Sequence, residues 1–595
     1  MRPPHILQAN HSLESPWESV WLDTETSQHQ LDHNSVEHRL RFGWAAYRRR
    51  LRGDTWTEPD WFRFERASDF WTWIESLAHG RGRLYVFSHN AGFDLPVVDA
   101  FRELPGRGWQ LQKAVIECPP VILRWRRGKY SILALDTLNI WRLPLEKLGE
   151  QIGLAKLEMP AEDASAEDWD TYCKRDVHVI MTACLTWWKL LRDHRLGSFA
   201  PTLAGQAMRA YRHRFMTMPL FVDADPEALN LARMSYLGGR VECYRVGRVE
   251  GPIYRLDVNS MYPYVMRAHR YPTKLVGYTA RATIEDLGEW LVDRCVTAEV
   301  EIVTDEPVYP LVIDGRLCFP VGRFVTSLAS PELYDALEHG RIVRVLQAAV
   351  YESAEIFREF VDYFWTERRK AQVEGDWVTD RLLWKFTNSL YGKWGQRGRV
   401  YEEVGSYPTM EARAWIEYDA DTGQVYKHRA LGGLWQMWRD ESESRESMPQ
   451  IAAHVCSYAR LYLWSLMCEA GRENVYYCDT DGLPVSQAGY DRLLHRIDPN
   501  VLGALKLEST EAWAIYHGPK DYQYPSHAKT KGVRKKAHWV TDSDVVQEQW
   551  SSLLGMMQAG NLHAPTTRLI TKHLARRYGK GTVTEDGLVL PFMLG

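Results

Sequence analysis

Cysteine is scarce in this sequence: nine of the 595 residues are cysteines, and no two of them form a Cys-x-x-Cys pair. An odd number without that spacing disfavours a zinc site or a disulfide framework and indicates a reducing compartment. The sequence also lacks an apolar run long enough to cross a bilayer, and Met1 to Pro16 lack the apolar stretch of a signal peptide. We therefore expect a soluble, cytoplasmic protein with no membrane partner.

An excess of positive charge is lacking as well, because 73 lysines and arginines face 77 aspartates and glutamates, for a net charge of -4. This is weak evidence against a nucleic-acid partner, since a binding groove needs only a local positive stripe. Internal repeats and low-complexity tracts are absent too. A chain of this length exceeds one hydrophobic core, so we expect several domains.

Carboxylates recur in three segments of the N-terminal third. Asp23 and Glu25 follow a short apolar run, and residues two apart in a strand face the same side. Asp94 follows a second strand-like run, and Tyr172 and Asp176 share one face of an expected helix. Each segment alone also fits a solvated strand end or helix surface. Together, such carboxylates bind divalent ions, and two ions about 3.5–4 Å apart can cleave a phosphodiester.

A second set of carboxylates lies further along the chain. Asp257 stands where a strand-like run ends, and Asp479 and Asp481 occupy a tight turn that Gly482 makes easier. If these segments form adjacent strands, Asp257 and Asp481 meet at one end of a sheet. That arrangement would give a second site for two metal ions.

A helical segment with two cations lies between these carboxylates. Arg381 and Lys385 are four residues apart and share a helix face, which suits a triphosphate. The alternative is the basic face of a solvated helix. Trp384, Phe386 and Leu390 weaken that alternative, because they should anchor the helix against the fold.

The first three segments resemble, in order, the exonuclease motifs of family B DNA polymerases: Asp-x-Glu, Asn-x-x-x-Phe/Tyr-Asp and Tyr-x-x-x-Asp. Here two residues rather than three separate Asn90 from Phe93. The resemblance implies a ribonuclease-H-like 3′–5′ exonuclease in which Tyr172 orients the attacking water. Its expected metal ligands are Asp23, Glu25, Asp94 and Asp176, and its expected contacts to the frayed primer end are Asn90, Phe93, Thr137 and Leu138.

The later segments resemble polymerase motifs A, B and C of the same family: Asp-x-x-Ser-Leu-Tyr-Pro, Lys-x-x-x-Asn-Ser-x-Tyr-Gly and Asp-Thr-Asp. Met261 replaces the usual Leu, and two residues rather than three separate Lys385 from Asn388. One residue is about 100° on a helix, so Lys385 lies on the other flank of the face with Asn388. The resemblance implies catalytic Asp257, Asp479 and Asp481, metal ligands Asp257, Val258 and Asp481, and nucleotide contacts Tyr262, Arg381, Lys385, Asn388 and Tyr391.

Three flanking elements agree with this resemblance. Tyr236-Leu237-Gly238-Gly239 resembles the Tyr-x-Gly-Gly element that joins the exonuclease to the polymerase and touches the template. Lys520-Asp521-Tyr522 resembles the Lys-x-Tyr element that holds the primer terminus. The basic run that follows would contact phosphates. The DNA-binding residues expected from these elements are Tyr236, Gly238, Gly239, Lys520, Tyr522, Lys535 and Lys536.

Two long intervals separate the polymerase motifs: 122 residues from Pro263 to Lys385 (385 − 263) and 87 from Gly392 to Asp479 (479 − 392). They resemble the insertions of the protein-primed branch of phages and linear plasmids. In that branch, one insertion contacts a terminal protein and the other closes around the template.

We expect a mixed α/β, multidomain fold, with a ribonuclease-H-like exonuclease followed by a right-hand polymerase of palm, fingers and thumb. The expected divisions are an arm at 1–18, the exonuclease at 19–200, palm at 201–263, an insertion at 264–355, fingers at 356–396, a second insertion with palm at 397–450, palm at 451–536 and thumb at 537–595.

The resemblance implies replicative, protein-primed and strand-displacing DNA synthesis on a template, with 3′–5′ proofreading by two-metal-ion phosphoryl transfer. It would take place in the cytoplasm of a host cell if a phage encodes the chain. Expected cofactors are two Mg²⁺ per site, or Mn²⁺. Expected partners are primer-template DNA, deoxynucleoside triphosphates and a terminal protein primer. Two alternatives stay open: an oligonucleotide-primed family B polymerase, and a nuclease or DNA-binding scaffold whose polymerase half is inactive. The intact Asp257, Asp479 and Asp481 argue against the second.

Overall fold

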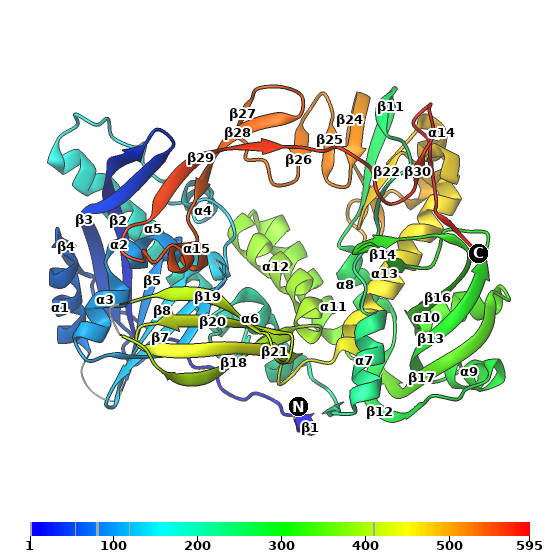
Figure 1. Ribbon diagram of the computed structural model, residues 1–595, viewed down its shortest axis with the longest axis horizontal. Helices are drawn as coiled ribbons and strands as arrows, with labels where there is room; N and C mark the ends of the chain where they lie inside the picture. Colours follow the sequence, from blue (N-terminus) through cyan, green and yellow to red (C-terminus); the bar gives the residue numbers. More distant parts are fainter. Residues whose placement is uncertain (1–2, 54, 79–81, 118, 409–410) are drawn as a thin grey trace.

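The structure is a computed structural model that describes residues 3–53, 55–78, 82–117, 119–408 and 411–595. Two lobes face each other, with a sheet-rich N-terminal lobe on one side and the polymerase-like region on the other (Figure 1). Helix α12 stands between the lobes, and strands from the C-terminal part of the chain cross from one lobe to the other. The expectation of a mixed α/β fold with several domains is confirmed.

The N-terminal lobe is built on a sheet with the order β27-β28-β29-β3-β2-β5-β8-β7-β6, to which β4 adds by pairing with β3. Helix α5 (Ala166–Asp193) packs against β2 and β3, and Ser165 begins it with a capping box. The strands are β2 (Glu18–Asp32), β3 (Ser35–Arg49), β4 (Asp60–Phe64), β5 (Arg83–Ser88), β6 (Gln110–Ile116), β7 (Val121–Arg127), β8 (Tyr130–Asp136), β27 (His538–Trp539), β28 (Asp544–Trp550) and β29 (Thr566–His573).

Strand β2 extends well beyond the short apolar run that precedes Asp23. Val20, Trp21 and Leu22 are fully buried, but the strand continues to Asp32. Beyond the buried run, backbone hydrogen bonds to β3 hold it. The apolar pattern therefore marks where the core ends and not where the strand ends.

The palm region is a sheet with the order β10-β22-β23-β11-β24-β25-β26. Helix α13 (Pro449–Ala470) is buried along most of its length and leads to β22. The strands are β10 (Val241–Cys243), β11 (Gly247–Val258), β22 (Tyr477–Asp479), β23 (Gly482–Val485), β24 (Leu505–Gly518), β25 (Asp521–Gln523) and β26 (Ala528–Thr530).

The amphipathic sequence patterns over 356–370 and 380–391, which predict an antiparallel helix pair in the fingers, correspond to α11 (Arg358–Glu374) and α12 (Trp377–Trp394). Gly375 ends α11 in the left-handed conformation with φ of 71°, and the Asp376 carboxylate caps α12. Since only two residues link them, the helices pack against each other as an antiparallel pair. Phe386 of α12 stacks on Trp187 of α5 at 5.3 Å, which joins the fingers to the N-terminal lobe.

The interval after Pro263 folds as a sheet with the order β12-β17-β13-β16-β32, together with short helices. Glu332 of α10 (Ser330–Glu338) forms a fully buried ion pair with Arg460 of α13 at 2.8 Å, which fixes this insertion to the palm. The strands are β12 (Tyr271–Thr279), β13 (Cys295–Thr304), β16 (Val321–Ala329), β17 (Ile342–Ala354) and β32 (Met593–Leu594).

The second interval holds a sheet with the order β18-β21-β20-β19. Helix α15 (Leu553–Gln558), from the C-terminal region, packs against β19 and closes the end of this sheet. The strands are β18 (Arg397–Ser406), β19 (Arg413–Asp419), β20 (Gln424–Leu431) and β21 (Leu434–Glu443).

Both ends of the chain are fastened to distant segments. The N-terminal segment is more than an irregular arm, because β1 (His5–Leu7) pairs with β9 (Leu220–Val222). The C-terminal region pairs β29 with β3 of the N-terminal lobe and β32 with β16 of the insertion. Residues 537–595 therefore contact both lobes (Figure 1).

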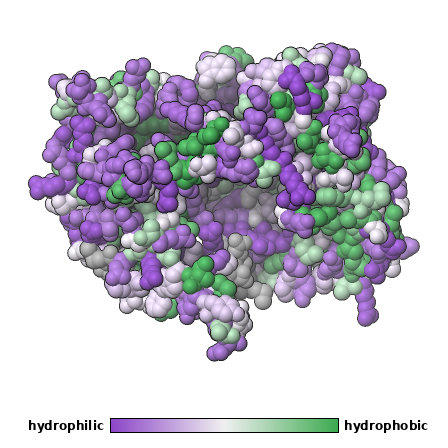
Figure 2. Space-filling view, turned by 45° about the horizontal axis from the view of Figure 1, so that its top comes forward, coloured by the Kyte–Doolittle hydropathy of each residue, from purple (hydrophilic) through white to green (hydrophobic). Residues whose placement is uncertain are grey.

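The face drawn in Figure 2 is mostly hydrophilic, with hydrophobic residues scattered over it. Among the described residues, none of the helices combines the length and the apolar character that crossing a membrane requires.

Candidate active sites

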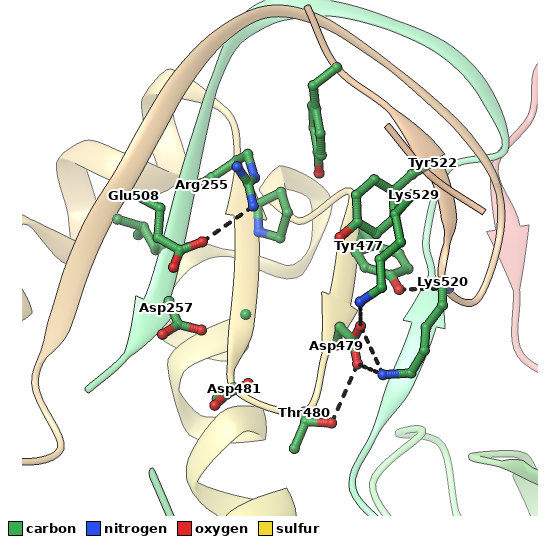
Figure 3. A pocket seen from close by; sticks show the side chains of 14 residues that line it. Arg255, Asp257, Tyr477, Asp479, Thr480, Asp481, Glu508, Lys520, Tyr522 and Lys529 are labelled. Carbon is green, nitrogen blue, oxygen red and sulfur yellow. Dashed lines mark hydrogen bonds and ion pairs between the residues drawn. The ribbon is translucent and has the colours of Figure 1, made fainter. Parts of the chain in front are cut away.

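The carboxylates of the polymerase-like motifs lie on the palm sheet, where β11 and β23 run side by side. Asp257 stands opposite Gly482 in the register, and the Val258 N–H donates to the Asp481 carbonyl at 2.9 Å. Asp257 and Asp481 thus meet at one end of the sheet, as the sequence predicted. They line a cleft of about 360 Å³ together with Asp479 (Figure 3).

The electrostatics of this pair favour a divalent cation. Burial raises the pKa of Asp481 to about 7, and the neighbouring charge of Asp257 adds to the shift. Burial also raises the pKa of Asp257, although Lys506 opposes that shift. The raised pKa values show that the surroundings of the two carboxylates hold too little positive charge to stabilise both ionised groups. A hard divalent ion such as Mg²⁺ would supply that charge. The residues present therefore fit the metal that the resemblance implies.

Asp479 lies beside the other two carboxylates but has partners of its own. Lys520 Nζ lies 2.8 and 3.2 Å from its two carboxylate oxygens, and Lys529 Nζ lies 3.9 Å away (Figure 3). The Lys520 backbone N–H donates to the Tyr477 hydroxyl at 3.0 Å, and Lys520 adopts a φ of 60°. The structure therefore brings the Lys-x-Tyr element to the carboxylates, with Tyr522 lining the same cleft.

Lys506 belongs to this site and was missed by the sequence analysis. It stands opposite Asp257 on β24, and its Nζ lies 3.0 Å from Asp257 Oδ2. It also lies 3.6 Å from Glu508. The pairing of β11 with β24 joins segments about half the chain apart, so no local pattern pointed to this lysine.

The residues expected beneath an incoming nucleotide lie next to the carboxylates. Tyr262, on α8 (Met261–Ala268), stacks on Tyr391 of α12, with ring centroids 4.2 Å apart and planes at 17°. Burial raises the pKa of Tyr391 to about 12, so its hydroxyl stays protonated at neutral pH. The two rings form a flat, uncharged floor between palm and fingers.

The Tyr-x-Gly-Gly element packs against this floor. A Cβ on Gly239 would lie 2.9 Å from Thr480 Cγ2 and 3.0 Å from the Tyr262 hydroxyl, so a side chain there would have to displace one of these groups. Gly238 accepts a hydrogen bond from Arg460 at 2.9 Å, and Tyr236 packs closely against the end of α12. The element thereby links the palm, the fingers and helix α13.

The basic face of α12 divides into two parts. Arg381 is exposed over the Trp384 ring at 4.6 Å. Lys385 Nζ is buried with no hydrogen-bond partner among the described residues, and burial together with Arg381 lowers its pKa to about 8. Asn388 uses its amide within the helix, donating to the Trp384 carbonyl at 3.0 Å. A buried cation without a counter-ion is unfavourable, so Lys385 is suited to an anionic ligand.

The carboxylates of the exonuclease-like motifs form another cluster, on the N-terminal lobe. Asp23 and Glu25 alternate along β2 and are half-buried. Between them, the Thr24 hydroxyl donates to the carboxylate of Asp94 at 2.7 Å. Asp94 itself is buried on α2 (Ala91–Val97). Carboxylates predicted from two separate segments therefore gather around one strand.

Helix α5 adds its own carboxylate to this cluster. Tyr172 and Asp176 lie on the same buried face, as their spacing predicted. Lys156 Nζ bonds to the Asp176 carboxylate and lies 4.2 Å from the Tyr172 ring centroid. Asp176 Oδ1 is buried and has no hydrogen-bond partner in the described part of the chain. Such an unpaired buried oxygen is an available ligand for a cation.

Burial also disfavours ionisation in this cluster. It raises the pKa of Asp23 to about 6 and, with the charge of Asp23, that of Glu25 to about 8. Burial raises the pKa of Asp94 well above its usual range. Lys156 opposes the shifts of Asp23 and Glu25 but supplies only one positive charge. Divalent cations would complete the charge balance, so this cluster also fits Mg²⁺.

Cys173 lies in the same cluster and was not considered from the sequence. Its Sγ lies 3.7 Å from Asp23 Oδ2, and ligand atoms of Asp23, Glu25 and Cys173 lie within 4.8 Å of one another. Burial raises the pKa of the thiol well above its usual range, so it stays protonated. A neutral thiol is a weak donor and a poor metal ligand, so Cys173 supports Asp23 instead.

The residues expected to contact single-stranded DNA differ in exposure. Asn90 is exposed with φ of 80°, and its N–H donates to Asp136 at 3.0 Å. Phe93 and Leu138 are half-buried. Thr137 is buried and its hydroxyl donates to a carbonyl of β5 at 3.3 Å, so it supports the loop rather than presenting a free hydroxyl.

The two lysines expected to bind phosphates beyond the palm, Lys535 and Lys536, are exposed in the segment between β26 and β27. This segment continues from the cleft that Lys529 and Lys520 line. Positive charge is therefore distributed along one path although the chain as a whole is acidic.

Comparison with known proteins identifies relatives of this chain. The family described as DNA polymerase type B, organellar and viral, matches residues 156–422. A probable DNA polymerase of Neurospora intermedia is 25% identical over 338 residues, covering 54% of this chain and 34% of that protein. The DNA-directed DNA polymerase of Enterobacteria phage PRD1 is 25% identical over 493 residues, covering 81% of this chain and 79% of that protein.

A solved structure shares the fold. Phi29 DNA polymerase, complexed with primer-template DNA and incoming nucleotide substrates, superposes with a TM-score of 0.68 at 15% identity, covering 94% of this chain and 100% of that chain. The chain spans 34% of the length of the Neurospora protein and 79% of the phage protein. These similarities confirm the family resemblance drawn from the motifs.

Proposed function

We propose that the chain is a type B DNA polymerase that synthesises DNA on a template, with primer-template DNA and deoxynucleoside triphosphates as substrates. The observation that carries the proposal is the pairing of Asp257 with Asp481 at the end of two adjacent strands, in a cleft that lysines also line. Phosphoryl transfer needs this combination of carboxylates and cations.

The three carboxylates have different tasks in this proposal. Mg²⁺ or Mn²⁺, held by Asp257, Val258 and Asp481, would supply the Lewis-acid chemistry of the transfer. Asp479 holds Lys520 beside the cleft. Lys520 then contacts the phosphate of the primer terminus and keeps the 3′ end in place.

The fingers and the aromatic floor bind the nucleotide. Arg381 and Lys385 contact the triphosphate and neutralise its charge. Asn388 shapes the same helix face. The stacked rings of Tyr262 and Tyr391 lie under the sugar and base. The Tyr262 ring excludes a 2′ hydroxyl.

Extension of a labelled primer annealed to a defined template tests this function. With Mg²⁺ and all four deoxynucleotides, the primer should reach the end of the template. With one nucleotide omitted, extension should stop at the first position that requires it. Absence of extension, or extension that ignores the template, would contradict the proposal.

We also propose a 3′–5′ exonuclease in the N-terminal lobe, which removes mispaired ends. Its support is the cluster on the N-terminal lobe, which holds four carboxylates, among them Asp23, together with Lys156. Mg²⁺ held by these carboxylates would activate the attacking water. Tyr172 orients that water, and Lys156 faces the scissile phosphate. Asn90, Phe93 and Leu138 contact the single strand, with Thr137 behind them.

Initiation on a terminal protein is the finer part of the proposal. The insertion after Pro263 is a sheet fixed to the palm through Glu332 and Arg460, beside the groove that a primer must enter. It would receive the protein primer. The second insertion, β18 to β21, would close over the template and help displace a downstream strand. We propose residues 537–595 as the thumb, which holds duplex DNA.

A further inference from the structure

The C-terminal hairpin of β28 and β29 joins the N-terminal lobe beside its carboxylate cluster. Strand β29 pairs with β3, with Thr567 opposite Val36. The His38 N–H donates to the Pro565 carbonyl at 2.9 Å, which continues this pairing along β3. A segment more than 500 residues away in the sequence (565 − 38 = 527) thus forms part of the wall of the candidate exonuclease site.

Three aromatic rings meet where the hairpin joins. The Trp550 ring of β28 stacks on His38, with centroids 5.1 Å apart and planes at 24°. It also meets Phe93 edge-to-face at 5.6 Å, and His38 meets Phe93 at the same distance. Phe93 is the residue expected to contact the frayed primer end, and its partner Trp550 comes from a different region of the chain.

The His38 ring of this group is held in place by hydrogen bonds. His38 is only 3% exposed, and its Nε2 forms a hydrogen bond with the Thr567 hydroxyl at 3.1 Å. Its Nδ1 lies 3.4 Å from the Thr26 hydroxyl. His38 therefore serves as a fixed support between the hairpin and β2.

Trp550, in contrast, is 40% exposed. One face of its indole lies on His38, so the exposed area lies on the remaining face and edges. Large aromatic rings usually bury more of their surface against the core. A supported ring with exposed surface is the arrangement that proteins use to stack nucleobases of single strands.

The carboxylates of the cluster lie directly beside these rings in the chain. Phe93 precedes Asp94 on α2, and Thr26 follows Glu25 on β2. A strand whose 3′ end reaches the carboxylates must therefore pass close to Phe93 and its neighbour Trp550. The bases next to the reacting end are the ones within reach of the indole.

We propose that Trp550 is a binding residue of the exonuclease site and stacks on a base of the single 3′ strand. The inference rests on the exonuclease proposed above. It assigns part of the nuclease substrate site to the C-terminal hairpin rather than to the N-terminal lobe alone. Because residues 537–595 are also proposed to hold duplex DNA, one element contacts DNA on both sides of the melted end.

The test measures degradation of a 5′-labelled oligothymidylate of about 12 nucleotides, within the site sizes of single-strand binding proteins. Trp550→Ala should raise KM by about tenfold and change kcat little, since stacking aids binding and not bond cleavage. Trp550→Phe keeps an aromatic face and should stay near the parent. Trp550→Leu keeps apolar packing without that face and should resemble Trp550→Ala.

Trp17→Ala is the matched control, because Trp17 immediately precedes β2, is 54% exposed and has Arg50 over its ring at 4.1 Å, away from the proposed DNA contacts. It should degrade the oligonucleotide with the parent's KM. Equal KM values for the parent, Trp550→Phe and Trp550→Leu would show that the indole only packs, and would overturn the inference. If Trp550→Ala melts at a lower temperature than the parent, the comparison of the Phe and Leu variants decides.

Failure of the underlying proposal has a different result. A parent protein that leaves the oligonucleotide intact with Mg²⁺ or Mn²⁺ would contradict the exonuclease itself, and the inference with it. A parent that degrades the oligonucleotide while all Trp550 variants match it would overturn only the role of Trp550.

Discussion

Lys385 is a buried cation whose Nζ has no hydrogen-bond partner among the described residues. Burial and the charge of Arg381 lower its pKa to about 8, so the side chain is charged below that pH and neutral above it. A triphosphate would supply the missing negative charge. The protonation state of Lys385 before the nucleotide binds then changes with pH around pH 8.

We predict that the KM for a deoxynucleotide rises with pH above about 8, by up to about tenfold per pH unit, as Lys385 loses its proton. Lys385→Arg should remove this dependence, because a guanidinium stays charged. Steady-state primer extension across this pH range measures both profiles. Parallel pH profiles in the parent and the arginine variant would contradict a contact between Lys385 and the triphosphate.

The Tyr262 ring leads to a prediction about discrimination between ribo- and deoxynucleotides. Its ring is held between Tyr391 and Gly239, so it cannot easily yield to a larger sugar. Tyr262→Val should lower discrimination against ribonucleotides by about 10–100-fold, since excluding one group contributes about 1–3 kcal/mol. Tyr262→Phe keeps the ring and should retain discrimination. Single-turnover incorporation of matched ribo- and deoxynucleotides would decide, and unchanged discrimination in the valine variant would exclude the gate.

Some residues of the two candidate sites could be predicted from the sequence and others could not. Asp257 and Asp481 were predictable because one lies near the end of β11 and the other in the turn before β23, each within a recognisable motif. Lys506 was not, since its place opposite Asp257 depends on the long-range pairing of β11 with β24. Trp550 was hidden for the same reason, because its partners lie on β3 and α2. Motifs report local chemistry, whereas pairing between distant strands leaves no local pattern.

At the scale of elements, the insertion after Pro263 separates into a supporting sheet and a peripheral hairpin. The sheet contains β13, β16 and β17, and its helix α10 carries the buried Glu332. Strands β14 (Leu311–Ile313) and β15 (Arg316–Cys318) pair only with each other among the described residues. A deletion that spans residues 307–340 would therefore remove structural support, whereas the hairpin can be shortened alone.

We predict that replacing residues 312–317 with two glycines spares extension of a DNA primer but weakens attachment of the first nucleotide to a partner protein. Loss of one interface hot spot of about 2 kcal/mol corresponds to about a 30-fold effect. The measurement compares both reactions with the protein encoded beside this polymerase. Shortening the β19–β20 turn at residues 420–423 is the control. Equal activity of the hairpin variant in both reactions would oppose this role.

Elements differ in how far their bounds could be predicted. The finger helices α11 and α12 were found because their apolar and polar residues alternate with a helical period. The full length of strand β2 could not be predicted from its apolar run, because its second half is held by hydrogen bonds to β3 and not by burial. Ladder hydrogen bonds outside the core leave no apolar signature in the sequence.

At the scale of the whole molecule, the C-terminal region connects the two lobes. It adds β29 to the edge of the N-terminal sheet and β32 to the insertion sheet (Figure 1). Since the lysines before β27 lead from the cleft into this region, bound duplex DNA should lie along it. The acidic net charge conceals this local positive path.

We predict that DNA binding depends steeply on salt. Each phosphate contact contributes about −0.9 to the log–log slope, so Lys535→Ala with Lys536→Ala should flatten the slope by about 1.8. Lys147→Ala with Lys189→Ala changes the charge equally at two lysines paired within their own helices, and should leave the slope unaltered. Titrations of primer-template DNA at several salt concentrations provide the slopes. Identical slopes in all three proteins would place Lys535 and Lys536 away from DNA.

The central claim is that one chain carries two separate carboxylate sites, one for synthesis and one for degradation. Asp481→Ala alters only the palm cluster, and Asp23→Ala with Glu25→Ala alters only the cluster of the N-terminal lobe. Each change removes ligands for a cation, so the affected activity should fall by about a hundredfold or more. Measuring primer extension and primer degradation for both variants tests the claim most directly. If the two sites are separate, Asp481→Ala will still degrade the primer but will not extend it, and the double variant will do the reverse. Loss of both activities in either variant, while it remains folded and bound to DNA, would contradict the presence of two separate sites.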